Sequence, residues 1–201
     1  MYPKSVLFLG ASAAAREWFW NVRQTHPEIV VAFSDDVSPK TELVINHIAY
    51  PIVKDWDVRS LQAQYPHIPG AFTEFLVGVA EPKVKKVLVE KALAHGLRPA
   101  PTLITQADVR PDCHVGRGGI IWNTTCSSEV VVGDYCTIMF STVSTDVRIG
   151  DYANVYPGNH LASDVVLEEG VCLGANTTVR ERCRLAPWVV TGQCTCVVKS
   201  I

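Results

Sequence analysis

The sequence lacks the features that mark membrane-spanning, disulfide-bonded or zinc-binding chains. No apolar run approaches the roughly 18–20 residues that a transmembrane helix needs, so we expect no membrane span. The seven cysteines contain no Cys-x-x-Cys pair, and an odd number with this spacing is not typical of a disulfide framework or a zinc ribbon. We therefore expect small buried thiols in a cytoplasmic protein, and no bound metal.

The sequence also lacks an excess of charge of one sign. Lys and Arg number 18 against 20 Asp and Glu, which gives a formal net charge of −2 and a pI near 6.3. Nucleic-acid binding would need clustered Lys and Arg, so we expect no nucleic-acid partner. With 48% hydrophobic residues, the 201-residue chain can bury a core and fits one large or two small domains.

The first half of the chain has the pattern of a nucleotide-binding βαβ unit. Residues 5–9 predict a strand that ends at Gly10-Ala11-Ser12, and a β-branched strand at 29–33 ends at Asp35 and Asp36. The helix expected between them has an apolar face formed by Ala15, Trp18, Phe19 and Val22. The free N–H groups of the first helical turn face an anion in such units. Candidate substrate contacts are therefore Gly10, Ser12, Asp35 and Asp36.

The glycine content of this turn leaves an alternative open. The three-glycine fingerprint of dinucleotide-binding proteins is absent, because alanines occupy positions 13–15. A βαβ scaffold without a ligand is therefore the alternative.

Residues 75–80 predict a further buried strand, and a helix from Pro82 is expected to end before Gly96. The proline-rich segment 97–104 predicts a linker.

The second half repeats with a period of six residues. Eight of the nine positions reached by steps of six from Ile149 are aliphatic, and the exception is Thr191. The nine are Ile149, Val155, Leu161, Leu167, Leu173, Val179, Leu185, Thr191 and Val197. A helix would need apolar residues every three or four positions, and a hairpin sheet would alternate in twos. A period of six predicts a triangular solenoid in which each short strand points one side chain inward.

The repeat extends back to about Val109, which predicts about five coils. Val115 to Val132 and Val132 to Ile149 are each 17 steps, one short of three hexapeptides. We therefore expect successive coils to lose one residue at the same corner, so that they still stack.

These two halves, in this order, resemble the NeuD/PglD-like sugar acyltransferases of the left-handed β-helix superfamily. The resemblance is carried by Leu9-Gly10-Ala11-Ser12 with Phe33-Ser34-Asp35-Asp36, by Pro101-Thr102-Leu103-Ile104, and by coils such as Val147-Arg148-Ile149-Gly150-Asp151-Tyr152. It implies an α/β plus β-solenoid fold, with a Rossmann-like nucleotide-sugar-binding domain over 1–104 and a left-handed parallel β-helix over 105–201. It also implies a homotrimer with active sites between subunits, acetyl-CoA or another acyl-CoA as co-substrate, and a nucleotide-linked amino sugar as acceptor.

The sequence departs from the family pattern at the position of the catalytic base. In such enzymes a sugar amine or hydroxyl attacks the thioester, commonly helped by a histidine beside an acid. The family pattern places this histidine four residues before the Ile-Gly that opens the next coil, and often a second histidine in that coil. Here Thr145, followed by Asp146, occupies the first place and Asn154 the second. The candidate catalytic residues are Asp146, His160 and Thr145, and Asn154 is a candidate substrate contact.

Three explanations of this departure are open. The amine arrives neutral or passes its proton to Asp146, so that acylation proceeds by positioning. Alternatively His160 takes over as base, or the chain binds ligands without catalysis. His160 is otherwise a surface or cofactor-contacting histidine at a coil corner, and Asp146 a turn acid that caps backbone N–H groups.

The resemblance also suggests where acyl-CoA binds. Gly174, Ala175 and Trp188 are candidate contacts, because a small coil residue leaves room for the pantetheine arm; the alternative for Trp188 is corner packing.

The predicted function is N-acyl transfer, with acetyl as the expected group, to a nucleotide-linked amino sugar in surface polysaccharide or lipopolysaccharide biosynthesis. The alternative is a catalytically silent relative that binds a sugar nucleotide or a protein partner. A metal-dependent hydratase needs three converging histidines, and the solenoid offers only His114 and His160.

Overall fold

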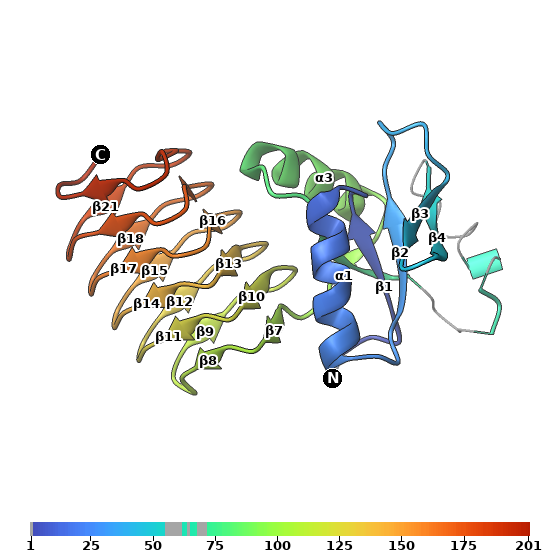
Figure 1. Ribbon diagram of the computed structural model, residues 1–201, viewed down its shortest axis with the longest axis horizontal. Coiled ribbons are helices and arrows are strands. Elements are labelled where there is room, and N and C mark those ends of the chain that lie inside the picture. Colours follow the sequence, from blue (N-terminus) through green and yellow to red (C-terminus); the bar gives the residue numbers. More distant parts are fainter. Residues whose placement is uncertain (1, 55–61, 64, 68–71) are drawn as a thin grey trace. The chain divides into compact units, whose positions relative to one another are not determined.

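The computed structural model describes residues 2–54, 62–63, 65–67 and 72–201. Its contacts divide the chain into two compact units (Figure 1). The first comprises Met1–Ala80 and Val84–Pro101, and the second comprises Glu81–Lys83 and Thr102–Ile201. Among the residues described, no helix combines the length and the apolar character needed to cross a bilayer.

The first unit is built on a sheet with the strand order β3-β4-β2-β1-β5-β6. The strands are β1 Ser5–Leu9, β2 Val30–Ser34, β3 Glu42–Ile45, β4 Ile48–Val53, β5 Glu74–Val77 and β6 Arg98–Pro99. All pairings are parallel except the β3–β4 hairpin. β1 is buried over its whole length, as the continuous apolar run predicts for the centre of a parallel sheet.

The longer helices described in this unit are α1 Ala13–Thr25 and α3 Pro82–Ala94. The Ser12 hydroxyl caps α1 by accepting a hydrogen bond from the Ala15 N–H at 3.4 Å. The four apolar residues predicted for one face of α1 are all buried. The predicted strand–helix–strand order is thus confirmed. Gly96 follows α3 in the left-handed conformation, with φ of +78°.

Position 10 requires glycine, both because of its backbone conformation and because its neighbours leave no room for a side chain. Its φ is +99°, and a Cβ there would lie 2.5 Å from Cγ1 of Val79. Gly96 has a similar positive φ but no atom within 4 Å of such a Cβ. We expect Gly10→Ala to lower the free energy of unfolding by about 2–4 kcal/mol, since strain and overlap add. Gly96→Ala, with strain alone, is expected to lose about 1 kcal/mol in the same urea titration. Equal losses would contradict the packing role of Gly10.

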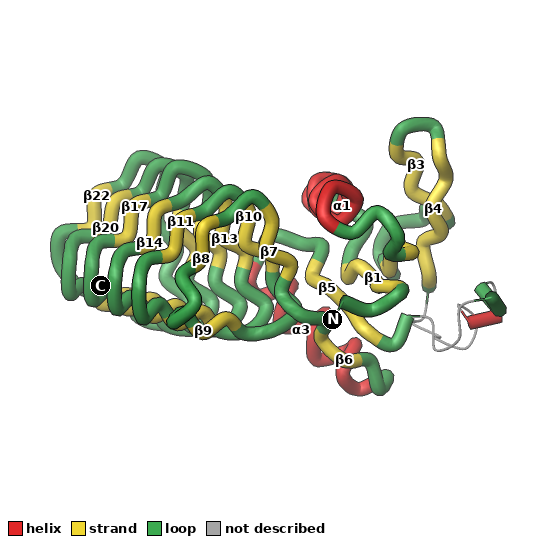
Figure 2. The backbone as a smooth tube through the Cα atoms, turned by 90° about the horizontal axis from the view of Figure 1, so that it is seen from below, coloured by secondary structure: helices red, strands yellow, loops and turns green. Residues whose placement is uncertain are grey.

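The second unit is a β-solenoid of three parallel sheets, as the six-residue period predicts (Figures 1 and 2). The first solenoid sheet contains β7 Leu103–Thr105, β10 Ile120–Trp122, β13 Thr137–Met139, β16 Asn154–Val155 and β19 Cys172–Leu173. The second contains β8 Asp108–Val109, β11 Thr125–Cys126, β14 Thr142–Val143, β17 His160–Leu161, β20 Thr178–Val179 and β22 Cys196–Val197. The third contains β9 His114–Val115, β12 Val131–Val132, β15 Arg148–Ile149, β18 Val166–Leu167 and β21 Arg184–Leu185.

The prediction of a linker at 97–104 was wrong in part. This segment contains β6 and the first two residues of β7, so the solenoid begins before Val109. The prolines of this segment had been taken to indicate a linker. Pro99 lies in an edge strand, where a residue without an N–H is tolerated.

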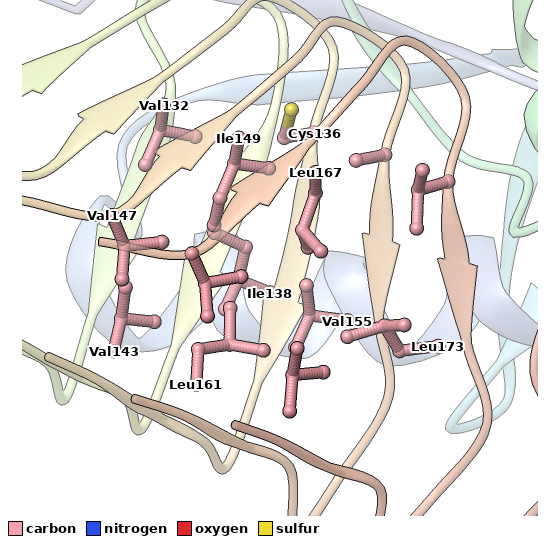
Figure 3. Packing of buried hydrophobic residues seen from close by; sticks show 14 of the residues in the cluster. Val132, Cys136, Ile138, Val143, Val147, Ile149, Val155, Leu161, Leu167 and Leu173 are labelled. Atoms are coloured by element: carbon pink, nitrogen blue, oxygen red, sulfur yellow. The ribbon is translucent and has the colours of Figure 1, made fainter. Parts of the chain in front are cut away.

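The solenoid core is a column of inward aliphatic side chains, which includes Ile138, Val155, Leu161 and Leu173 (Figure 3). The predicted residue loss falls at one shared corner, between the first and second solenoid sheets. Ile121 and Cys126 pair with Ile138 and Val143, and the step within each coil is five residues. From Val155 to Leu161 the step is six, and these residues stay in register with the shorter coil before them.

The longer corner is filled by Asn159, which is buried. Its Nδ2 donates to the Tyr156 carbonyl at 2.5 Å, and its Oδ1 accepts from the Thr177 N–H at 2.7 Å. In a shorter corner Ser141 donates to Met139 of its own turn at 2.7 Å. Polar side chains inside the corners therefore satisfy backbone groups and let coils of unequal length stack.

The glycine–acid pairs of the coils also have a structural role. Asp134 Oδ1 accepts from the Arg117 N–H at 2.7 Å, and Asp151 Oδ1 accepts from the Asp134 N–H at 2.8 Å. A Cβ at Gly116 or Gly133 would collide with the carboxylate beneath it, at 2.4 and 2.3 Å. Each acid thus caps the coil before it, and glycine gives it room.

All seven cysteines are free thiols. Cys126, Cys136 and Cys183 are buried in the solenoid core, as expected, but Cys194 and Cys196 are exposed. Burial raises the pKa of the Cys126 thiol to about 12, with smaller contributions from Cys113 and Asp108. Cys126 is therefore a neutral packing residue.

Candidate functional site

The β1–α1 turn is held to the ends of the strands on either side of it. Gly10 donates its N–H to the Ser34 carbonyl at 2.7 Å, which joins the turn to β2. The Ser12 hydroxyl donates to the Gly78 carbonyl at 3.0 Å, beyond the end of β5, while it caps α1. Its one donor proton is thus directed at the protein backbone. The structure gives Ser12 a role in shaping the turn, and its contact with a substrate stays a prediction.

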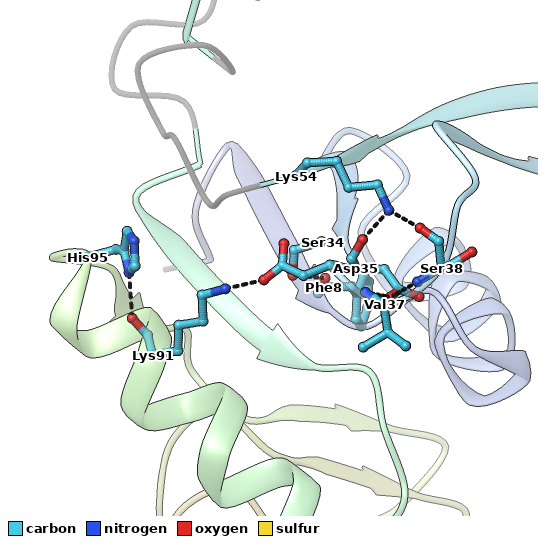
Figure 4. Close-up of polar contacts among 9 residues, drawn as sticks. Phe8, Ser34, Asp35, Val37, Ser38, Lys54, Lys91 and His95 are labelled. Atoms are coloured by element: carbon cyan, nitrogen blue, oxygen red, sulfur yellow. Dashed lines mark hydrogen bonds and ion pairs between the residues drawn. The ribbon is translucent and has the colours of Figure 1, made fainter.

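The two acids after β2 are engaged in different ways (Figure 4). Asp35 Oδ1 accepts from the N–H groups of Val37 and Ser38, at 3.0 and 2.9 Å, and so closes a turn on its own loop. The Asp36 carboxylate forms an ion pair with the Lys91 ammonium on α3. The Lys54 ammonium donates to the carbonyls of Asp35 and Ser38. One acid therefore shapes the loop and the other meets a cation.

The structure brings the four predicted contacts of the first unit to one edge. Leu9 pairs with Ser34, so Gly10 and Ser12 follow β1 where Asp35 and Asp36 follow β2. Neighbouring parallel strands end together, and ligands bind outside these ends in open α/β sheets. No sequence pattern pointed to Lys54 or Lys91, because they lie 19 and 55 positions from the acids of this loop.

Thr145 and Asp146 occupy the corner between the second and third solenoid sheets. Asp146 is exposed, has φ of +63°, and donates its N–H to the Ser128 carbonyl at 3.2 Å. Within the described part of the chain its carboxylate accepts no hydrogen bond and forms no ion pair, so the capping alternative is not supported. Thr145 is half-buried, and its carbonyl accepts from the Asp164 N–H at 3.2 Å.

His160 and Asn154 lie on different sheets. His160 is exposed and opens β17, between Thr142 and Thr178, so it is a strand residue and not a corner residue. No hydrogen bond or ion pair among the described residues joins it to Asp146. Asn154 is fully buried in β16, between Thr137 and Cys172. Within one chain, only Thr145 and Asp146 are therefore brought together.

The three predicted cofactor contacts have packing roles. A Cβ on Gly174 would lie 2.5 Å from the Gly192 carbonyl oxygen, and Ala175 accepts from the Cys194 N–H at 2.8 Å. A Cβ on Gly170 would lie 2.2 Å from Cε3 of Trp188. Trp188 thus covers a corner glycine, which is the packing role given above as its alternative. Their contact with acyl-CoA stays a prediction.

Among the described residues, a groove in each unit can be outlined, and Thr145, Asp146 and His160 line neither of these two. A groove of about 550 Å³ in the first unit lies between α1 and the β3–β4 hairpin, lined by Ala13, Arg16, Glu17, Trp20, Val44, Ile45 and Asn46. A groove of about 440 Å³ on the last coils is lined by Glu168, Arg184, Ala186, Pro187, Ser200 and Ile201.

Comparison with known proteins identifies the fold. No protein-family model and no curated protein matches the sequence. Among solved structures, a His-to-Ala variant of GDP-perosamine N-acetyltransferase from Caulobacter crescentus, in complex with CoA and GDP-perosamine, matches with a TM-score of 0.85 and 21% identity, over 98% of this chain and 90% of that one. The acetyltransferase domain of PglB from Neisseria gonorrhoeae, in complex with acetyl coenzyme A, matches with a TM-score of 0.78 and 21% identity, over 99% and 93%.

WeeI from Acinetobacter baumannii matches with a TM-score of 0.65 and 19% identity, over 96% of this chain and 94% of that one. The chain has the fold of these proteins. They include sugar N-acetyltransferases of the left-handed β-helix family, so the family resemblance seen in the sequence is confirmed at the level of the fold.

The corner at Thr145 carries an acid without a histidine. The residues that the structure describes contain no group of three or more His, Cys, Asp or Glu side chains placed to hold a metal ion. The chemistry available at this corner is that of a hydroxyl and an exposed carboxylate. Such a pair can orient an amine and accept its proton.

Proposed function

We propose that the chain is an acyl-CoA-dependent N-acyltransferase, which moves an acetyl group to the amino group of a nucleotide-linked amino sugar. The observation that carries this proposal is the match over 98% of the chain, and hence over both units, to a protein that holds CoA and GDP-perosamine. A Rossmann-like first domain over 1–104 would bind the nucleotide, and a left-handed β-helix over 105–201 would bind CoA. The product would serve surface polysaccharide biosynthesis in the cytoplasm.

The first domain is proposed to hold the sugar nucleotide at the carboxyl edge of β1 and β2. Gly10 lets the backbone turn closely past Val79, beyond the end of β5, and Ser12 fixes the start of α1 so that its first N–H groups face the phosphates. Asp36, with its carboxylate on the surface of the loop, is the candidate acceptor for ribose or base N–H and O–H groups. Asp35 contributes indirectly by shaping the loop.

Acyl transfer is proposed to take place beside Thr145 and Asp146, in a homotrimer whose active sites lie between subunits. The sugar amine attacks the thioester carbonyl carbon, the C–N bond forms, and the tetrahedral intermediate expels the CoA thiolate as the C–S bond breaks. The amine proton passes to Asp146 or to water, and the same acid or water returns a proton to the thiolate, so that CoA leaves as the thiol. Thr145 would orient the amine, His160 would contact the substrates, and Gly174, Ala175 and Trp188 would border CoA. The predicted substrate contact of Asn154 is not part of this proposal, because its side chain is fully buried. An amine needs less base assistance than a hydroxyl, which favours N-acylation at a corner without histidine.

The test is thiol release from acetyl-CoA with UDP-, dTDP- and GDP-linked amino sugars. We expect release with one acceptor, and a strong decrease on Asp146→Asn. Asp112→Asn is the matched control, because Asp112 is an exposed acid at the same corner two coils earlier and lies 34 positions before Asp146. Since Cys194 and Cys196 are exposed, the assay is corrected with enzyme lacking acceptor. No release with any acceptor would contradict the enzyme proposal.

A catalytically silent relative is the second candidate. The observation that favours it is the pair of departures at Thr145 and Asn154, of which Asn154 is fully buried. Such a protein would bind a sugar nucleotide or a protein partner without turnover. Its ligand binding would not change with Asp146→Asn or His160→Ala.

A further inference from the structure

The proposed nucleotide site carries negative charge that would repel the phosphates of its ligand. A sugar nucleotide carries two phosphate charges, and its site at the carboxyl edge of β1 and β2 carries Asp35 and Asp36. Two unpaired carboxylates beside a diphosphate would repel it. The site therefore needs cations from elsewhere in the fold.

Two lysines meet this need in different ways. The Lys54 ammonium donates to two carbonyls of the loop that begins at Asp35, and so holds that loop in place. The Lys91 ammonium reaches the loop from α3 and pairs with the Asp36 carboxylate (Figure 4). Lys91 is thus the cation that a separate element brings to the acids.

The Lys91–Asp36 pair is accessible to a ligand. The two side chains are 37% and 29% exposed, and an ion pair at this exposure adds little to stability. An ammonium has three N–H donors, so one lysine can serve a carboxylate and a phosphate together. Asp36 is two residues beyond Ser34, whose carbonyl accepts the Gly10 N–H of the β1–α1 turn.

We propose that Lys91 is a substrate-binding residue that contacts the diphosphate of the sugar nucleotide, with Asp36 as the residue that positions its ammonium. This inference rests on the proposed function. It assigns the phosphate contact to a side chain of α3, in addition to the N–H groups of α1. Lys54 acts through the loop and does not touch the ligand.

The test is calorimetric binding of UDP, dTDP and GDP to the full chain and to Lys91→Met. For the nucleotide that binds, we expect Lys91→Met to weaken binding about tenfold to a hundredfold, because a charge-assisted contact is lost. Lys91→Arg keeps the charge and is expected to restore most of the affinity. In turnover, Lys91→Met should raise KM for the sugar nucleotide and leave KM for acetyl-CoA unchanged.

Lys4→Met is the matched control, because Lys4 is an exposed lysine before β1, at the opposite edge of the same sheet. It should bind as the parent chain does. Equal affinity of Lys91→Met and parent would overturn the inference and leave the proposed function standing. A weakened Lys91→Met that also unfolds at lower urea without ligand, and that Lys91→Arg does not restore, would show a structural role and overturn it too. Failure of the parent chain to bind any of the three nucleotides would overturn both proposals.

Discussion

Thr145→His is expected to raise acyl transfer at neutral pH by about a hundredfold or more, since a positioned general base contributes roughly 10²–10⁴-fold. The substitution places an imidazole beside Asp146, whose exposed carboxylate has no partner among the described residues. A neutral imidazole accepts the amine proton above its ordinary pKa of about 6.5. The gain should therefore be present above about pH 6.5 and be lost as the pH falls and the imidazole is protonated.

Thr125→His is the control for this gain. Thr125 is an exposed threonine in β11, which pairs with β14 on the side away from β17, and an imidazole there lies on the sheet and not at the corner. It is expected to leave the rate unchanged. If Thr145→His gains nothing while the parent chain is active, base assistance at this corner does not limit the reaction. If only Thr145→His is active, the chain is a silent relative that one residue restores.

Ile138→Ala is expected to lower the free energy of unfolding by about 2–5 kcal/mol, the usual range for truncating a buried isoleucine. Ile138 is completely buried in the middle of the inward column, with neighbours from the coils before and after it. The solenoid has no second layer to close the cavity, because each coil packs only on the next. Urea denaturation gives the change, as a lower midpoint.

Ile104→Ala is the matched control for this truncation. Ile104 pairs with Ile121 in the same sheet column, two coils before Ile138, but is 39% exposed. Its replacement is expected to lower the unfolding free energy by about 1 kcal/mol or less. Similar losses at the two positions would mean that the column does not hold the solenoid together.

The local features of the chain were predictable because they repeat or lie close in sequence. The six-residue period fixed which side chains point inward, and the 17-step intervals between Val115, Val132 and Ile149 predicted a shared short corner. The buried face of α1 was predicted from the spacing of Ala15, Trp18, Phe19 and Val22. The linker at 97–104 was predicted wrongly in part, because proline does not distinguish an edge strand from a loop.

The candidate site was predictable only where it lies on neighbouring strands. Gly10 and Asp36 are brought to one edge by the strand–helix–strand order, which the sequence shows directly. The pairing of Asp36 with Lys91 was not visible, since charge patterns predict ion pairs only over three or four helical positions. The hydrogen bond from the Ser12 hydroxyl to the Gly78 carbonyl could not be predicted either, because β5 follows α1 by about fifty residues.

The sequence by itself determined a β-solenoid preceded by a strand–helix–strand unit, and an acid without histidine at the corner of Thr145. These follow from periodicity and from residue identity, which need no knowledge of distant contacts. Only the tertiary structure decided that Asp35 shapes its loop, that Asp36 pairs with Lys91, and that Asp146 stays exposed with no partner among the described residues. The physical reason is that a carboxylate is equally suited to cap a turn, pair with a cation or face solvent. Which of these it does depends on the groups that the fold brings within hydrogen-bonding distance.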